Sequence, residues 1–186
     1  MSPILGRPII IDCSHGLNNT KKGLFDPGAV NPRLGFREAD LVLSLGTMLE
    51  VYLRDRLRLP TYRIFDQPYS ARPMLANNHN GICFVSLEFN AAGGHGTEAL
   101  HYPLSVEGIR LSRILVEEIT RTTGWRNRGV LARTLGELKN TAMPASTLEV
   151  CFIDNDAEIQ TYLEKQHSIM LAISVGIMRY LAGSRA

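Results

Sequence analysis

The sequence predicts an α/β fold: a single domain with a twisted, mostly parallel sheet and helices on both faces. Apolar runs of strand length alternate with amphipathic helical patterns along the chain, as they do in α/β sheets. The run at 81–90 is apolar over most of its length, which is typical of parallel strands that are covered on both faces. The 186 residues suffice for one hydrophobic core but are few for two. We therefore expect one domain over residues 1–186.

The first half of the chain predicts three strands and two helices. A buried strand at 8–12 opens into a long polar loop at 16–35. Apolar residues spaced three and four apart then predict an amphipathic helix, which has Glu38 in its first turn and ends before Pro60. The remaining elements of this half are a strand at 61–65, a short helix within 69–81 and the strand at 81–90.

The second half predicts three further strands and three helices. Ser105 is a suitable N-cap, and Gly124 a suitable end, for a long helix between them. The run at 146–153 is typical of a buried strand, and it carries a carboxylate, Glu149. The other expected elements are a strand at 96–102, an edge strand at 126–134, and closing helices at 154–165 and 167–181.

Composition excludes several classes of protein. Hydrophobic residues make up 45% and charged residues 20% of the chain, which is ordinary for a soluble globular protein. A net charge of +2, with no face of Lys and Arg interleaved with aromatic residues, argues against nucleic-acid binding. We find no signal peptide and no membrane span, so we expect a protein that is made in the cytoplasm, and we expect a monomer.

The three cysteines predict buried free thiols rather than a disulfide scaffold. Cys13, Cys83 and Cys151 lie in or beside apolar runs, their number is odd, and no two of them are spaced as C-x-x-C. Cys13 lies two residues before His15, a spacing that also suits a metal site. We favour a small buried side chain at position 13, because unpaired cysteine is usually buried.

Polar residues at the ends of the predicted strands mark a candidate site. His15 follows the first strand, Glu88 lies near the end of the third, and Glu149 lies in a late strand. Glu38 opens the long helix, and Asp12 could accept a hydrogen bond that orients His15. Ligands of such sheets bind beyond the carboxyl ends of the strands. An imidazole and several carboxylates suit a divalent metal, since catalytic zinc takes three such ligands and leaves a position for water.

Each of these residues also has a purely structural interpretation. His15 could be a loop histidine that is bonded to the backbone, and Glu38 could complement the dipole of its helix. Glu149, inside an apolar run, could form a buried ion pair with Arg63 or Arg72. Spacing alone does not decide between these interpretations, because the candidate ligands share no short motif.

Several segments, taken in order, resemble one known family. "IIIDCSHGLNN" resembles the Asp-x-Gly-His-Gly loop of the zinc-dependent N-acetylmuramoyl-L-alanine amidases of the type 3 class. "DPGAVNPRLGFREADLVLSLGTMLEVYL" resembles their next block, in which a glutamate opens a long helix, and "ARPMLANNHNGICFVSLEFNA" resembles the strand that ends in Ser-x-His-x-Asn-Ala. "GTEALHYP", "RNRGV" and "MPASTLEVCFIDN" match the later blocks. The resemblance runs from Ile9 to about Leu181.

The resemblance implies a ligand set and a reaction. His15 matches the first zinc ligand of the family, Glu38 the second, and Glu149 the catalytic glutamate that works with the zinc-bound water. Glu88 stands where the family has its third ligand, a histidine. The implied reaction is hydrolysis of the amide between N-acetylmuramic acid and L-alanine in peptidoglycan. The chain also resembles a phage-type endolysin, which would act on the cell wall in the periplasm of the host; a bacterial or prophage-derived protein is the alternative.

The glutamate at position 88 leaves three interpretations open. Glu88 could itself be the third ligand, which would favour Mn²⁺ or another hard divalent ion beside Zn²⁺. His95, in the glycine-rich "GGHGTE", or His101, at the end of the next strand, could take its place. Alternatively, metal binding is weakened, and the chain is a poorly active or inactive peptidoglycan-binding protein on the same fold. A zinc carboxypeptidase of other specificity fits the ordered motifs less well.

Overall fold

The computed structural model of the chain describes residues 6–16 and 24–183. Its strands are β1 (Ile9–Cys13), β2 (Thr61–Ile64), β3 (Cys83–Asn90), β4 (Thr97–His101), β5 (Asn127–Ala132) and β6 (Ala145–Phe152). They form one six-stranded sheet in the order β2-β1-β3-β6-β4-β5. Neighbouring strands of this sheet run parallel, except that β4 is antiparallel to β6.

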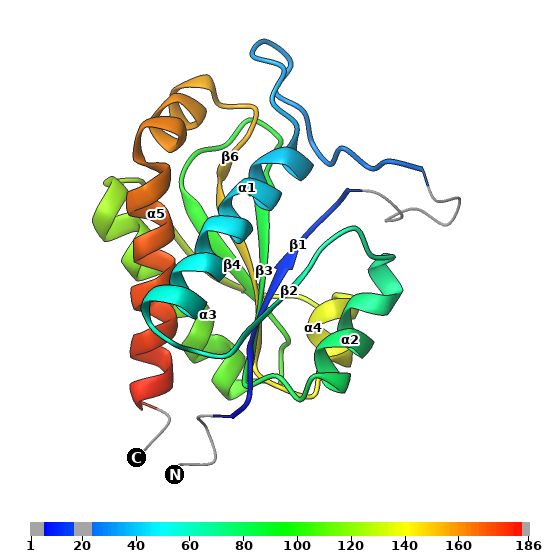
Figure 1. The fold of residues 1–186 in the computed structure, drawn as a ribbon. Coiled ribbons are helices and arrows are strands. Elements are labelled where there is room, and N and C mark those ends of the chain that lie inside the picture. Colours follow the sequence, from blue (N-terminus) through cyan, green and yellow to red (C-terminus); the bar gives the residue numbers. More distant parts are fainter. Residues whose placement is uncertain (1–5, 17–23, 184–186) are drawn as a thin grey trace.

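Helices cover both faces of the sheet, which confirms the predicted α/β class (Figure 1). On one face lie α1 (Glu38–Val51), α3 (Val106–Thr123) and α5 (Asp156–Gly183); on the other lie the shorter α2 (Arg72–Asn78) and α4 (Gly136–Asn140). A π-helical turn at Tyr52–Arg56 extends α1, and a 3-10 turn at Tyr69–Ala71 precedes α2. In the two described ranges, we find no helix with the length and apolarity that crossing a bilayer requires.

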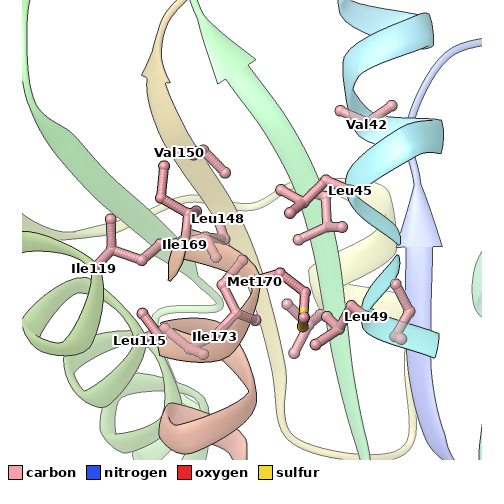
Figure 2. Packing of buried hydrophobic residues seen from close by; sticks show 14 of the residues in the cluster. Val42, Leu45, Leu49, Leu115, Ile119, Leu148, Val150, Ile169, Met170 and Ile173 are labelled. Atoms are coloured by element: carbon pink, nitrogen blue, oxygen red, sulfur yellow. The ribbon is translucent and has the colours of Figure 1, made fainter. Parts of the chain in front are cut away.

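The larger core lies between the sheet and the three long helices. Figure 2 shows Leu115 of α3 and Ile173 of α5 on the side of Leu148 of β6, and Leu45 and Leu49 of α1 on the side of β3 and β1. All five side chains are fully buried, and each such burial contributes about 1.5–3 kcal/mol. A smaller core on the other face comprises Ile10, Ile64, Ala76, Phe84, Leu138, Met143 and Ala145.

One continuous helix, α5, replaces the two that were predicted at 154–165 and 167–181. The prediction of a break was wrong because neither glycine nor proline stands between the two segments, and buried residues recur across the junction. The helix begins where expected: the side-chain oxygen of Asn155 accepts a hydrogen bond from the backbone N–H of Glu158 at 3.3 Å. This is an N-cap interaction.

The short helix α4 was not predicted, because five residues are too few to show a helical period. Tertiary contacts hold it instead. Asn77 of α2 donates to the backbone oxygen of Asn140 at 2.9 Å, and the carboxylate of Glu137 accepts from the hydroxyl of Tyr69. Together these contacts fix α4 beside α2 on the less covered face of the sheet.

The cysteines are buried free thiols, as predicted. Burial raises the pKa of Cys83 to about 12, which keeps its thiol protonated. A Cβ at Gly46 of α1 would come within 2.3 Å of Cys13 Sγ, so helix and strand meet closely at this point. This contact supports the interpretation of Cys13 as a small packing residue.

The antiparallel pairing of β4 decides which residues share an edge of the sheet. Strands β1, β3 and β6 end at one edge, and β4 and β5 begin there, because β4 runs against β6 and β5 follows β4. Glu98, near the start of β4, is therefore registered with Glu149, near the end of β6. His101, at the end of β4, lies towards the opposite edge.

Candidate metal centre

Three of the predicted ligands come together at the edge where β1, β3 and β6 end. His15 follows β1, Glu38 opens α1, and Glu88 lies near the end of β3. One ligand atom from each of them lies within 4.8 Å of the others, which is close enough for all three to bind one ion. Within 6–16 and 24–183, no other group of His, Cys, Asp and Glu side chains meets this spacing.

His15 is oriented by Asp26, on the far side of the loop. Its Nδ1 lies 2.9 Å from Asp26 Oδ2, and since a carboxylate only accepts, Nδ1 carries the proton. The other ring nitrogen, Nε2, faces Glu38 and lies 3.2 Å from its Oε2. Burial alone would lower the pKa of His15, but hydrogen bonds and charges from Glu38 and Asp26 raise it. The imidazole thus presents Nε2 to the space between the three ligands.

The role of orienting His15, one of two roles that the sequence left open for Asp12, belongs to Asp26. Asp12 Oδ2 accepts hydrogen bonds from Ser86 Oγ at 2.9 Å and from Arg72 Nη1 at 3.2 Å. Arg72 Nη2 in turn donates to the backbone oxygen of His15 at 3.2 Å. Asp12 therefore supports the loop from behind. The Asp-Pro-Gly turn that begins at Asp26 is the signal that could have indicated the correct residue.

Glu38 is fixed by backbone donors on both of its oxygens. Oε2 accepts from the N–H of Ala29 at 2.9 Å, and Oε1 accepts from the N–H of Phe89 at 2.8 Å. Gly28 permits this close approach, because it has φ of +67° and a Cβ there would lie 2.6 Å from Glu38 Oε2. The same Cβ would lie 2.8 Å from His15 Cδ2. One carboxylate thus joins the loop, the start of α1 and the end of β3.

Glu149 lies beside Glu88, at the position registered with it across β3 and β6. Its Oε2 is buried and has no hydrogen-bond partner among the described residues, which is costly for a carboxylate. Burial raises the pKa of Glu149 to about 8, and the charges of Glu38 and Glu98 add to the shift. Burial, reinforced by the charge of Glu149, also raises the pKa of Glu88 well above its ordinary value. Both carboxylates are therefore buried among other acids, and the positive charge of His15 offsets the shift of Glu149 only in part.

The buried ion pair considered for Glu149 does not form. Arg63 Nε donates to Glu50 of α1 at 2.7 Å, and Arg72 pairs with Asp12. Both arginines therefore have other partners, and Oε2 of Glu149 stays without a hydrogen-bond partner among residues 6–16 and 24–183.

Neither alternative histidine belongs to the three-ligand group. His101 lies towards the opposite edge of the sheet, where its Nδ1 is 3.0 Å from the carbonyl oxygen of Tyr102. The side chain of His95 is exposed on the connection between β3 and β4. The donor set around the centre is therefore one imidazole and two carboxylates, with Glu88 at the third position.

This donor set fits a divalent cation. Imidazole and carboxylate groups are ligands of zinc, and an oxygen-rich set also suits harder ions such as Mn²⁺. A cation would counteract both the burial and the neighbouring carboxylate charges that raise the pKa values of Glu88 and Glu149. The contact between His15 and Asp26 is of the kind that orients a metal-bound histidine.

A charged pair borders the site on the β4 side. Glu98 Oε1 accepts from Asn90 Nδ2 at 2.8 Å, and its Oε2 accepts from Arg128 Nε at 2.6 Å. Arg128 comes from β5 and is a neighbour that the sequence did not single out. Its sequence position, at the start of an edge strand, carries no periodic signal.

Comparisons with known proteins agree with the fold and identify the family. A family model described as N-acetylmuramoyl-L-alanine amidase matches residues 9–179. The chain is 32% identical over 158 residues to the N-acetylmuramoyl-L-alanine amidase CwlM of Bacillus licheniformis. This match covers 81% of this chain and 59% of that protein. It is 28% identical over 170 residues to the endolysin of Bacillus phage SPP1, and this match covers 83% of this chain and 58% of the endolysin.

Another relative, an uncharacterized cell wall amidase of Bacillus anthracis, is 29% identical over 165 residues, a match that covers 82% of this chain and 31% of that protein. The chain thus spans less than two thirds of the length of these curated relatives. Among solved structures, an N-acetylmuramoyl-L-alanine amidase of Clostridium difficile 630 superposes with a TM-score of 0.86 at 23% identity and covers 96% of this chain and 98% of that one. The catalytic domain of CwlV from Bacillus (Paenibacillus) polymyxa superposes with a TM-score of 0.82 at 23% identity, and the match covers 95% of this chain and 98% of that one. At these identities the two structures support the fold.

Proposed function

This chain belongs to the N-acetylmuramoyl-L-alanine amidase family, and from that premise we propose that it is a metal-dependent hydrolase of peptidoglycan. The bond cleaved is the amide between the lactyl group of N-acetylmuramic acid and the L-alanine of the stem peptide. One observation carries the proposal: the unpaired, buried oxygen of Glu149 lies beside the group formed by His15, Glu38 and Glu88. We assign all of residues 1–186 to this one amidase domain, because the family match covers 9–179.

Each residue of the site has a role in this reaction. His15, Glu38 and Glu88 would hold the cation, and Asp26 would keep Nε2 of the imidazole directed towards it. When bound, the cation supplies electrophilic assistance, since it polarises the scissile carbonyl and lowers the pKa of a water. Glu149 accepts a proton from the attacking water and passes it to the leaving nitrogen. The place of Glu149 beside Glu88 in the sheet register suits it to both steps.

We propose Zn²⁺ as the resident ion, with Mn²⁺ as the alternative, because two of the three ligands are carboxylates. Elemental analysis of protein purified without chelator measures which ion is retained. Recovery of about one equivalent of either ion supports the assigned ligand set, and its loss in Glu38→Gln ties the ion to this centre.

The function itself is tested on purified sacculi with a dye-release assay. Replacement of Glu149 by glutamine removes the proton acceptor, so we expect turnover to fall by about 100-fold or more, while the melting temperature stays the same or rises. Glu164→Gln, an exposed change on α5, is the matched control and should release dye like the wild type. A Glu149→Gln protein that retains most of its activity would rule out this role.

The replacement of the family's histidine by Glu88 favours one other function, peptidoglycan binding without turnover. In that case the purified protein would lack metal and release no dye, yet still sediment with sacculi. Glu88→His would then create lytic activity that the natural chain lacks. We propose the cell wall as the site of action and a monomer as the state in solution, and gel filtration measures the second of these.

A further inference from the structure

A bulge in the sheet places Arg128 near the start of β5, which is the end of that strand on the side of the candidate metal centre. The register between β4 and β5 shifts so that two residues of β5, Arg128 and Gly129, oppose the single residue Glu98. Gly129 has φ of +85°, a conformation that glycine adopts easily and that bulges use. Bulges of this kind commonly redirect a side chain next to a functional site. Here the redirected side chain is the guanidinium of Arg128.

The guanidinium of Arg128 is held on two sides, but its terminal nitrogens make few hydrogen bonds. Its Nε donates to Glu98 Oε2 at 2.6 Å, and its central carbon lies 4.9 Å from the ring centre of Phe152. Of its terminal nitrogens, Nη1 has one long contact, 3.5 Å to the carbonyl oxygen of His95, and Nη2 has none among the described residues. About 30% of the side chain is exposed. The fork end of Arg128 is therefore open to solvent in a fixed orientation.

Arg128 lies on the same face of the sheet as the catalytic carboxylate. Glu98, its ion-pair partner, is registered with Glu149, and residues registered across a sheet point to one face. Phe152, which its guanidinium covers, follows Glu149 on β6 towards the site edge. Because strands are about 4.8 Å apart, β5 lies about 10 Å from β6, and the side chain reaches back across part of that distance. One to two residues of an extended substrate peptide, each about 3.3–3.6 Å long, would span the distance that remains between the guanidinium and β6.

The charges around the site indicate which kind of substrate group Arg128 binds. Glu88, Glu149 and Glu98 form a row of carboxylates across β3, β6 and β4. Such a row repels an anionic group of a substrate, and a guanidinium at its end offsets the repulsion locally. An arginine fork also binds carboxylates in a planar, two-bond geometry.

We propose that Arg128 binds a carboxylate of the stem peptide on the leaving-group side, one residue beyond the L-alanine. This inference rests on the proposed amidase function. In a stem peptide whose second residue is a D-glutamate linked through its side chain, the α-carboxylate of that residue is free at this distance from the scissile amide. Arg128 would thus select peptidoglycan with a free carboxylate over peptidoglycan in which that group is an amide.

The test compares two soluble substrates that differ in this group alone. They are N-acetylmuramoyl-L-Ala-γ-D-Glu-L-Lys, with the free α-carboxylate, and its D-isoglutamine counterpart, with a carboxamide. For the wild type we expect kcat/KM to be about 10-fold higher on the carboxylate substrate, mainly through KM. In Arg128→Gln this preference should fall to about 1, because KM for the carboxylate substrate rises towards KM for the carboxamide substrate.

Two further variants separate binding from structure. Arg133→Gln, at the opposite edge of the sheet, is the matched control and should keep the preference. Arg128→Lys retains the charge without the fork and should keep part of the preference, which also provides the answer if Arg128→Gln does not fold. Equal kinetic losses on both substrates in the Arg128 variants, or no preference in the wild type, would overturn the inference. A wild type that cleaves neither substrate would instead overturn the proposed function on which it rests.

Discussion

Gly28 shows how closely the backbone approaches the candidate metal ligands. It is the point at which the loop passes over both His15 and Glu38, and its positive φ allows the turn that brings Ala29 into hydrogen-bond contact with Glu38. Any side chain here would push against two ligands at once. A residue without a reactive group therefore sets the geometry of the reactive ones.

Gly28→Ala should lower metal affinity by about 10-fold or more and the free energy of unfolding by about 1–3 kcal/mol, because the new Cβ collides with Glu38 and His15. Gly35→Ala is the matched control: Gly35 also has a positive φ, of +75°, but nothing lies within 4 Å of its ideal Cβ. Calorimetric titration with Zn²⁺ and chemical unfolding measure the two effects. Equal metal affinities in the two variants would show that strain alone, and not the collision, matters.

At this scale the sequence predicted which candidate site residues come together better than it predicted the residues that position them. His15, Glu38, Glu88 and Glu149 were found because strand ends and ordered motifs mark them, and the structure brings all four to one edge. Asp26 was missed, since a hydrogen bond across a loop leaves no periodic signal. Which partner a buried carboxylate finds depends on tertiary distances that spacing along the chain does not encode.

Among the elements, the start of α5 is the one most closely connected to the site. Asn155 caps the helix through its Oδ1 and also donates from Nδ2 to the carbonyl oxygen of Gly94 at 3.2 Å. The neighbouring Asp154 accepts from the N–H groups of Ala92 and Gly93. The helix terminus thereby fixes the connection between β3 and β4, which borders the candidate metal centre.

Asn155→Ala should reduce the free energy of unfolding by about 0.5–2 kcal/mol, because the first turn of α5 loses its cap. Asn155→Asp keeps an oxygen acceptor and should recover most of that loss, although it gives up the bond to Gly94. Urea unfolding followed by circular dichroism gives both values. Should the alanine and aspartate variants unfold at the same urea concentration as the wild type, the cap contributes nothing measurable.

The elements show where sequence patterns suffice. Long apolar periods and recognisable caps predicted α1 and α3 closely, and the bounds of all six strands differ from the expected ranges by a few residues. The five-residue α4 was not predicted, because tertiary contacts such as the one from Asn77 hold it. The continuity of α5 was not predicted either, although no helix breaker interrupts its sequence.

For the molecule as a whole, the main electrostatic feature is a group of buried acids at the candidate metal centre, where His15 is the one basic side chain that the described residues place among them. Burial raises the pKa of Glu149 to about 8 and the pKa of Glu88 well above its ordinary value. The metal-free folded protein therefore binds more protons than the unfolded chain between about pH 4.5 and 8. His15, whose pKa is also raised, acts in the same direction.

The free energy of unfolding of the metal-free protein should accordingly fall as the pH rises through this window. In EDTA we expect the melting temperature to drop by about 5 °C or more between pH 5 and pH 8. Glu149→Gln should flatten the profile, since it removes one of the groups that lose their protons. Saturating Zn²⁺ should reverse the trend, because the ion binds the deprotonated carboxylates. Melting curves by scanning calorimetry would contradict this account if the EDTA profile rose with pH.

The single antiparallel pairing, between β4 and β6, has a consequence for how this fold could be extended. It leaves the connection after β4, at 102–105, on the edge of the sheet away from the ligands, where Leu104 is 82% exposed. An additional module, such as a wall-anchoring domain or an affinity handle, could be grafted into that turn without approaching the reaction centre. The architecture thereby separates the surface that does chemistry from a surface that is free to acquire new attachments.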